Sequence, residues 1–180
     1  MRTCSASARP RATPFRRARR RLAAALLGLL AVVPPAAAQW VPTGAPLCVD
    51  CDADFSTDNL VIQDGHGGLF AAWRETRYYP STRSDVYLQR LTGNGSIAPG
   101  WPADGLGICV AERDQIAIRT APDGQGGALV TWIDQRGDND IYVQRVRGDG
   151  TLAPDWPENG AAATRAPGSQ ELPAVAPDGT

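Results

Sequence analysis

The sequence predicts an all-β protein built from repeated sheets of four antiparallel strands. The chain repeats itself, because residues 123–132 resemble residues 64–73 and residues 140–145 resemble residues 85–90. Each repeat consists of short apolar or alternating segments separated by Asp-Gly and Gly-Gly turns, a pattern typical of strands joined by tight turns. No segment after residue 38 has the apolar spacing of an amphipathic helix.

The repeat has a period of about 55 residues. Tyr87 and Tyr142 are 55 positions apart, and Trp73 and Trp132 are 59 apart. The difference of four is an insertion in residues 75–84, a loop that is longer in the first repeat. A fixed period of this size indicates a repeat architecture.

A second marker, Trp-x3-Gly-x3-Cys or Thr, occurs three times, at Trp40, Trp101 and Trp156. It divides the chain into two full repeats and a partial third, at about residues 40–100, 101–155 and 156–180. Closed rings of such units need about four to eight of them. The sequence therefore predicts a fragment of a longer protein, or a chain that assembles with copies of itself.

Each element of a repeat has its own signal. A polar loop follows the apolar run of the second expected strand, and the third strand alternates with period two. An Asp-Gly hairpin at residues 148–150 follows, because this dipeptide supplies the positive φ of a tight turn. In the second repeat the expected strands are residues 116–120, 128–133 and 141–146, followed by an irregular fourth strand at residues 151–152 and after Trp156.

Four short strands per period are typical of a β-propeller blade. Trp73 and Trp132, each at the end of a second strand, are expected to pack between neighbouring blades. Residues 40–49 are expected to form a strand beside the first sheet, completing a blade whose other strands are missing. The glycines of the Asp-Gly-x-Gly-Gly turns are interpreted as structural, since no helix or lysine follows them to bind a phosphate.

The repeated strings also resemble a known type of repeat. D-G-x-G-G-x4-W, followed by D-[IV]-Y-x-Q-R and G-x-G-x-[IL]-x-P-x-W-P, is similar to a repeat of large secreted bacterial proteins. The resemblance covers residues 40–180 and implies β-propellers distantly similar to those of the sialidase and Asp-box type. It implies a fold and leaves the function open.

Residues 1–38 are predicted to be a secretory signal peptide. A basic segment at residues 16–21 precedes an apolar stretch at residues 22–33, which is too short for a transmembrane helix. Small residues at 36–38 favour cleavage before Gln39. The repeat region, residues 39–180, is therefore expected to be secreted to the extracellular space or the periplasm, with no membrane span after cleavage.

The charge of the secreted part excludes some partners. Of the 18 basic residues, 8 lie in residues 1–38, whereas all 19 acidic residues follow it, so that residues 39–180 carry a net charge near −9. An acidic domain without a basic patch argues against nucleic acids and anionic membranes as partners.

One segment has the spacing of a cation site. Asp50, Asp52, Asp54 and Asp58 stand at alternate positions with Ser56, and hard cations such as calcium bind several such oxygens from one loop. No glycine occupies the sixth position and no Glu the twelfth. Calcium at these residues is one hypothesis, and a solvated acidic loop is the other; no other cofactor is expected.

The loops after the second strands are the predicted binding elements. Both are expected on one face of a propeller, and the longer one carries Arg77, Tyr78, Tyr79 and Arg83. Tyr rings and guanidinium groups suit a carbohydrate or protein ligand through stacking and paired hydrogen bonds. The alternative is a variable surface loop whose tyrosines cover the edge of the blade.

Three cysteines follow the signal peptide, and their pairing stays open. Cys48 and Cys51 could close a small loop and leave Cys109 unpaired, or Cys51 could bridge to another blade. An odd count in a secreted chain suggests a partner cysteine elsewhere.

Two functions are consistent with these patterns. The first is a non-catalytic secreted propeller module for adhesion or recognition of a carbohydrate or other ligand. The alternative is part of a sialidase-like glycoside hydrolase or lyase, which would need paired carboxylates and an arginine cluster. We expect the first, because no catalytic constellation is visible in the sequence.

Overall fold

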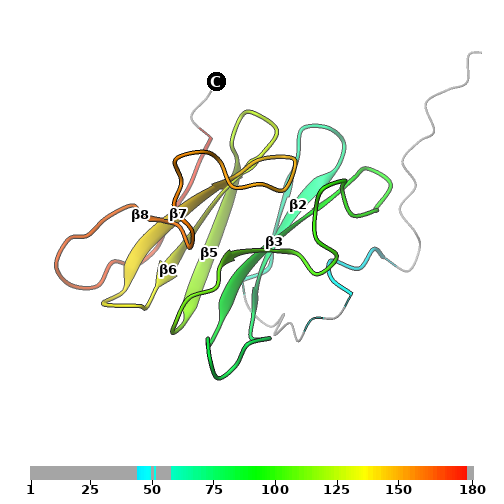
Figure 1. The fold of residues 1–180 in the computed structure, drawn as a ribbon. Helices are drawn as coiled ribbons and strands as arrows, with labels where there is room; N and C mark the ends of the chain where they lie inside the picture. Colours follow the sequence, from blue (N-terminus) through cyan, green and yellow to red (C-terminus); the bar gives the residue numbers. More distant parts are fainter. Residues whose placement is uncertain (1–43, 50, 52–57, 178–180) are drawn as a thin grey trace, which may run out of the picture. The chain divides into compact units, whose positions relative to one another are not determined.

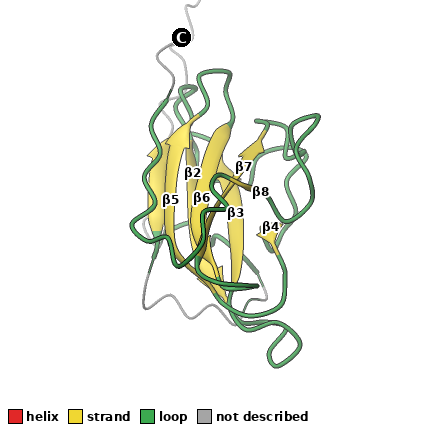
Figure 2. Ribbon diagram, turned by 90° about the vertical axis from the view of Figure 1, so that its left-hand side faces the viewer, coloured by secondary structure: helices red, strands yellow, loops and turns green. Residues whose placement is uncertain are grey.

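The computed structural model describes residues 44–49, 51 and 58–177. In this part of the chain it contains strands and turns and no helix (Figures 1 and 2). Eight strands form two separate antiparallel sheets of four strands each. The expected all-β class with two four-stranded antiparallel sheets is thus confirmed. None of the described residues forms a helix that is long and apolar enough to cross a membrane.

The first sheet contains strands β1 to β4 in chain order. Their bounds are Leu60–Gln63, Leu69–Glu75, Asp85–Leu91 and Leu106–Cys109. The two central strands are almost fully buried, whereas β1 alternates between half-buried and exposed positions, as expected for the edge of a sheet.

The second sheet repeats this order with β5 to β8. Their bounds are Gln115–Pro122, Ala128–Asp134, Asp140–Val146 and Ala161–Ala162. The predicted strands and the irregular fourth strand of this repeat are confirmed. Strand β5 extends beyond its expected ends and carries a bulge at Ala117, which has a φ of 55°.

The Asp-Gly turns are built in the same way in both sheets. A carboxylate oxygen of Asp64 accepts hydrogen bonds of 2.8 Å from the backbone amides of His66 and Gly68. Asp123 does the same for the amides two and four residues further on. The Asp side chain thus replaces missing partners of the turn backbone, which explains why an Asp stands before the glycines in each repeat.

The other oxygen of each of these carboxylates forms an ion pair across the sheet. Arg90 reaches Asp64 at 2.8 Å, and Arg145 reaches Asp123 at 2.9 Å. Burial alone would raise the pKa of the Asp64 carboxyl, but the arginine and the two turn amides bind the charged form and lower it. The Asp-Gly turn motif and the D-[IV]-Y-x-Q-R motif of each repeat are therefore joined by an ion pair.

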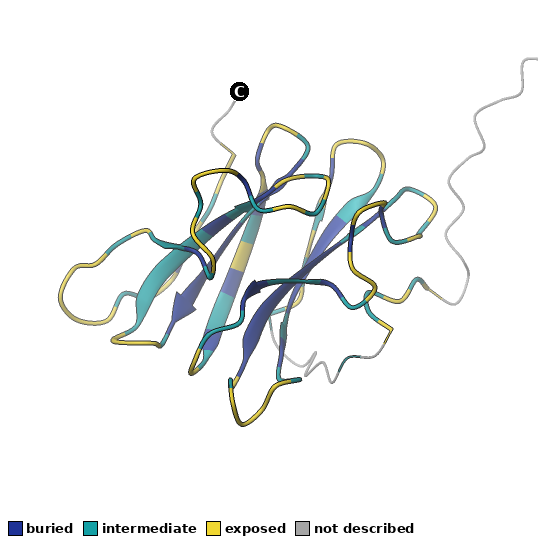
Figure 3. Cartoon of the chain, in the orientation of Figure 1, coloured by how far each residue is buried: buried dark blue, intermediate teal, exposed yellow. Residues whose placement is uncertain are grey.

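The main core lies between the two sheets. Figure 3 shows buried residues along the strands and exposed residues mainly in the loops. Trp132 belongs to the cluster between the sheets, as expected of a residue packed between neighbouring blades. The cluster is made of Phe70, Ala72, Val86, Leu88, Ala98, Trp101, Ile108, Cys109, Ile118, Ala128, Val130, Trp132 and Val146.

Trp73 lies on the other face of the first sheet, since Phe70 and Ala72 of the same strand point into the cluster. Its indole is nevertheless fully buried. Residues 44–49 lie against this face, where the carbonyl oxygen of Leu47 accepts a hydrogen bond of 3.2 Å from Gln89.

The expected strand at residues 40–49 is corrected in part. Residues 40–43 lie outside the described residues, and residues 44–49 lie beside the first sheet but form no regular strand. The edge of β3 is already paired with β4. Residues 44–49 therefore pack on the face of this sheet.

Candidate functional site

A groove lies beside the long loop between β2 and β3. It has a volume of about 750 Å³ and opens widely to solvent. Its lining includes three of the four residues that the sequence singled out for ligand binding. The lining residues are Arg77, Tyr78, Tyr79, Ser81, Thr82, Tyr87, Gly105, Gly107 and Val110.

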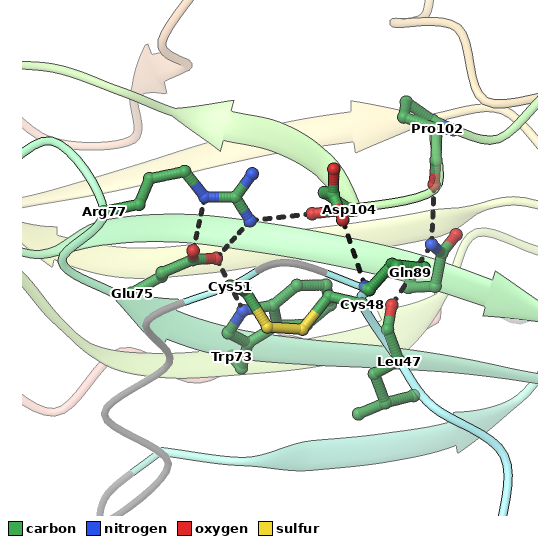
Figure 4. Close-up of a disulfide and its surroundings, with 10 residues drawn as sticks. Leu47, Cys48, Cys51, Trp73, Glu75, Arg77, Gln89, Pro102 and Asp104 are labelled. Carbon is green, nitrogen blue, oxygen red and sulfur yellow. Dashed lines mark hydrogen bonds and ion pairs between the residues drawn. A yellow bond between two sulfur atoms is a disulfide. The ribbon is translucent and has the colours of Figure 1, made fainter.

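Arg77 forms one wall of the groove and is held in place on several sides. Its guanidinium pairs with the carboxylate of Glu75 and donates a hydrogen bond of 2.8 Å to the carbonyl oxygen of Asp104 (Figure 4). It also lies over the ring of Tyr87, 4.2 Å from the ring centre. Arg77 therefore presents a fixed, stacked cation to the groove.

The partner of this arginine is itself positioned by the core. Glu75 is completely buried and accepts a hydrogen bond of 3.0 Å from the indole nitrogen of Trp73. Burial alone would lower the pKa of Arg77, but the hydrogen bonds to Glu75 raise it. The arginine remains charged at every physiological pH.

The second sheet repeats this arrangement. The indole of Trp132 donates to Asp134 at 2.9 Å, Arg136 pairs with Asp134 at 2.8 Å, and Arg136 lies 4.4 Å from the ring centre of Tyr142. Sequence reasoning missed this unit, although Trp-x-[Glu/Asp]-x-Arg occurs in both repeats. The stacked arginine thus belongs to both repeats, whereas the first repeat differs in its longer loop.

The two tyrosines of the longer loop make that difference. Tyr78 is 51% exposed and Tyr79 is 71% exposed. The loop holds its shape through backbone hydrogen bonds from Tyr79 to Thr76 at 2.9 Å and from Thr82 to Tyr78 at 3.1 Å. Large exposed rings on a defined loop are available for contact with a ligand.

Arg83, the fourth predicted ligand-binding residue, does not line the groove. It is exposed and lies 3.5 Å from the carboxylate of Asp114, in the connection between the two sheets. Next to it, Ser84 donates a hydrogen bond of 2.8 Å to the same carboxylate. These contacts fasten the loop to the start of the second sheet.

Asp85 stands at the base of this loop in an unusual environment. It is fully buried, one carboxylate oxygen accepts a hydrogen bond of 2.8 Å from Thr82, and the other has no hydrogen-bond partner. Burial raises the pKa of Asp85 to about 6, with a further rise from the charge of Glu75. The loop that lines the groove is therefore held at its base by a buried acid with one unsatisfied oxygen.

Of the four predicted calcium ligands, the structure describes only Asp58. Asp50, Asp52 and Asp54 lie outside the described residues. Asp58 accepts a hydrogen bond of 3.0 Å from the backbone amide of Ala117 in the second sheet. Among the residues that are described, no group of three or more His, Cys, Asp or Glu side chains is placed to hold a metal ion.

The cysteines adopt one of the pairings that the sequence left open. Cys48 and Cys51 form a disulfide (Figure 4), and Cys109 is free and buried. The sulfur of Cys109 lies 3.5 Å from a carboxylate oxygen of Asp134, across the boundary between the sheets. Burial raises the pKa of this thiol, and the nearby negative charge of Asp134 raises it further. The thiol is therefore neutral and unreactive at neutral pH.

A scan against models of protein families, a search of curated proteins and a search of solved structures each found no match to this chain.

Proposed function

We propose that this chain is a secreted, non-catalytic recognition module made of β-propeller blades, and that the groove beside Tyr78 and Tyr79 binds carbohydrate. The observation that carries the proposal is the open groove of about 750 Å³ with two exposed rings and a fixed arginine. Aromatic rings pack against the apolar faces of sugars, and a guanidinium donates paired hydrogen bonds to their oxygens or acidic groups.

Contacts that recur between successive units support the assignment as blades. The amide of Gln115 donates to the carbonyl of Ser84 at 2.9 Å, and the amide of Gln170 donates to Asn139 at the same position of the next repeat. In a propeller, each blade meets the following one in the same way.

A second recurring contact involves the ends of the fourth strands. The amide of Val110 donates a hydrogen bond of 2.8 Å to the side chain of Asn159. The amide of Val49 donates one of 3.0 Å to Asp104, one repeat earlier. Residues 44–49 thus occupy the place against the first sheet that a preceding blade would occupy.

The composition of the groove favours recognition over catalysis. None of the described residues that line it carries a carboxylate. A glycoside hydrolase generally needs two carboxyl groups on opposite sides of the scissile bond, about 5 to 10 Å apart. Of the carboxylates close in sequence to lining residues, Glu75 and Asp85 are completely buried, and half-buried Asp104 accepts a hydrogen bond of 3.0 Å from the amide of Val49.

Binding to an array of bacterial and host glycans, followed by calorimetry with each positive glycan, tests the groove. We expect a Kd in the range of about 10 µM to 1 mM for the full chain. Replacing Tyr78 and Tyr79 together with Ala is expected to weaken binding at least tenfold. The double change to Phe keeps the rings and should retain most of the affinity.

The matched control is Asp138→Ala, an exposed residue in the short loop of the second sheet. It should leave glycan binding unchanged. Equal loss in this control and in the Tyr78 and Tyr79 double Ala variant would contradict the assignment of the groove. Binding of no glycan, or cleavage of one, would contradict carbohydrate recognition without catalysis.

Export is tested separately by the intact mass of the chain recovered from the culture medium or periplasm. Cleavage after Ala38 predicts an N-terminus at Gln39, unchanged or cyclised to pyroglutamate. A cell-associated chain that retains residues 1–38 would contradict secretion.

A further inference from the structure

A second cavity adjoins the groove beside Tyr78 and Tyr79. It has a volume of about 360 Å³ and lies between β4 and the segment that follows the hairpin after β7. We call it the side groove; it is lined by Leu106, Gly107, Ile108 and Val110 from the first sheet and by Leu152, Glu158 and Asn159 from the second. Gly107 and Val110 also line the groove, so that the two cavities meet at β4.

The missing side chain of Gly107 leaves space where the two cavities meet. A Cβ atom at this position would lie 2.9 Å from Cγ2 of Val110 and 3.6 Å from the ring of Tyr87, which lines the groove. The second sheet has Ala162 and Arg165 at the positions of Gly107 and Val110, 55 residues later. The smaller residues therefore occur in the same sheet as the longer loop with its two tyrosines.

Aliphatic side chains give the side groove an apolar surface. Leu106, Val110 and Leu152 are half-buried, whereas Ile108 is almost fully buried. Leu106 and Leu152 also pack against the outside of the main core, which holds them in place. A small apolar group of a ligand, such as a methyl group, would gain free energy by displacing water from these side chains.

Two polar side chains line the same cavity, and one of them is fixed. Oδ1 of Asn159 accepts a hydrogen bond of 2.8 Å from the backbone amide of Val110, and the carbonyl oxygen of Asn159 accepts one of 3.0 Å from Arg136. Within the described part of the chain, Nδ2 of Asn159 donates to no acceptor, which leaves it for a ligand. Glu158 is exposed and offers a carboxylate as acceptor. The side groove thus combines an apolar surface with one donor and one acceptor.

An acetamido group carries the three complementary parts. Its methyl group is apolar, its carbonyl oxygen accepts a hydrogen bond and its N–H donates one, as in a peptide group. A hydroxyl group at the same place would leave the aliphatic side chains in contact with water. A carboxylate of the ligand would be repelled by Glu158. The lining of the side groove therefore favours an N-acetylated sugar over a plain or an acidic one.

We propose that the two cavities together bind a linear oligosaccharide of N-acetylated sugars. One sugar ring stacks on Tyr78 and Tyr79, and the acetamido group of a further sugar lies in the side groove. There its oxygen accepts a hydrogen bond from Asn159 and its N–H donates one to Glu158. The inference rests on the carbohydrate binding proposed above and names the kind of carbohydrate. A single sugar is too short to cross Gly107 and uses the groove alone.

Calorimetry of the full chain with two matched series of oligosaccharides tests this proposal. Chito-oligosaccharides and cello-oligosaccharides of one to six units share the same β-1,4-linked backbone and differ in the acetamido group. We expect the affinity for the chitin series to rise about tenfold from its shortest binding member to its longer members and then to level off. Cello-oligosaccharides of the same length should bind about tenfold more weakly.

Two variants remove the polar contacts of the side groove one at a time. Asn159→Asp keeps an acceptor for the amide of Val110 and tolerates the φ of 60° at this position, but it lacks the Nδ2 donor. Glu158→Ala removes an exposed carboxylate. Each should weaken binding of the longest chito-oligosaccharide about fivefold, the contribution of one hydrogen bond, and leave the shortest binding member unaffected.

The matched control, Asp138→Ala, removes an exposed carboxylate from the short loop of the second sheet and should bind every oligosaccharide like the unchanged chain. Unfolding temperatures of the variants check that each one is folded.

The outcomes separate the side groove from the groove. Binding that requires Tyr78 and Tyr79 but neither grows with chain length nor weakens in Asn159→Asp would overturn this proposal and leave the groove assigned. Equal affinity for the two series would also overturn it. If neither series binds, the proposal fails, whereas other glycans that bind on the array would still support the groove.

Discussion

Gly105 lies directly against the indole of Trp73: a Cβ atom at Gly105 would stand 2.3 Å from the ring. The same pair recurs in the second sheet between Gly160 and Trp132, again at 2.3 Å. Each indole is completely buried and donates to an acidic residue two positions later. The Trp of the second strand and the Gly before the fourth strand of each sheet therefore form one packing unit.

Gly105→Ala is expected to lower the free energy of unfolding by about 2 to 4 kcal/mol. The methyl group has no room beside Trp73, and Gly105 has a φ of 80°, which disfavours any other residue. Chemical denaturation checks this value. The control is Gly65→Ala, with a φ of 75° and nothing within 4 Å of its Cβ position, which should cost about 1 kcal/mol. Equal losses in the two variants would refute the packing argument.

Asp64→Ala is expected to cost about 3 kcal/mol, because it leaves Arg90 and two turn amides without their partner. The lowered pKa of Asp64 adds a pH dependence. Its stabilisation is complete above the unfolded pKa of about 3.9 and is lost as the pH falls through the lower folded value. Denaturation at pH 7 and at pH 2 should show a smaller difference from the unchanged chain at pH 2 than at pH 7.

Asp85→Asn is expected to raise the free energy of unfolding, whereas Asp64→Ala lowers it. The folded pKa of about 6 lies above the unfolded value, so the charged carboxylate destabilises the fold as the pH rises from about 4 to above 6. The Asn variant should therefore be more stable than the unchanged chain at pH 8, by about 1 to 3 kcal/mol, and nearly equal to it at pH 3.5. Asp140→Asn, half-buried at the same position of the second repeat, is the control. A variant that is less stable at pH 8 would contradict this assignment.

The sequence predicted the strands well because their signals are local. The apolar run before Asp134 reflects burial of β6 on both faces, and the alternation after Asp140 is a local period-two pattern. The disulfide between Cys48 and Cys51 was one of several pairings, since spacing alone did not select it. The strand predicted at residues 40–49 rested on the repeat alone, which does not reveal that β4 already pairs with the edge of β3.

The candidate site was harder to foresee. Tyr78 and Tyr79 were found from their residue type in a loop that is longer than its repeat, and they line the groove. Arg83, chosen on the same basis, lies outside it. The stacking of Arg77 on Tyr87 and the orphaned oxygen of Asp85 depend on contacts between strands, which no local pattern encodes.

The central claim is that the two sheets are successive blades joined through Gly148, and solvent exchange of the indole N–H protons tests it most directly. The signals of Trp101 and Trp156 are assigned by comparing ¹⁵N spectra of the dilute chain with those of the Trp101→Phe and Trp156→Phe variants. We predict slow exchange for Trp101, whose N–H is bound to Gly148 at 3.0 Å, and fast exchange for the half-buried Trp156. Equally fast exchange of both indoles would contradict the account.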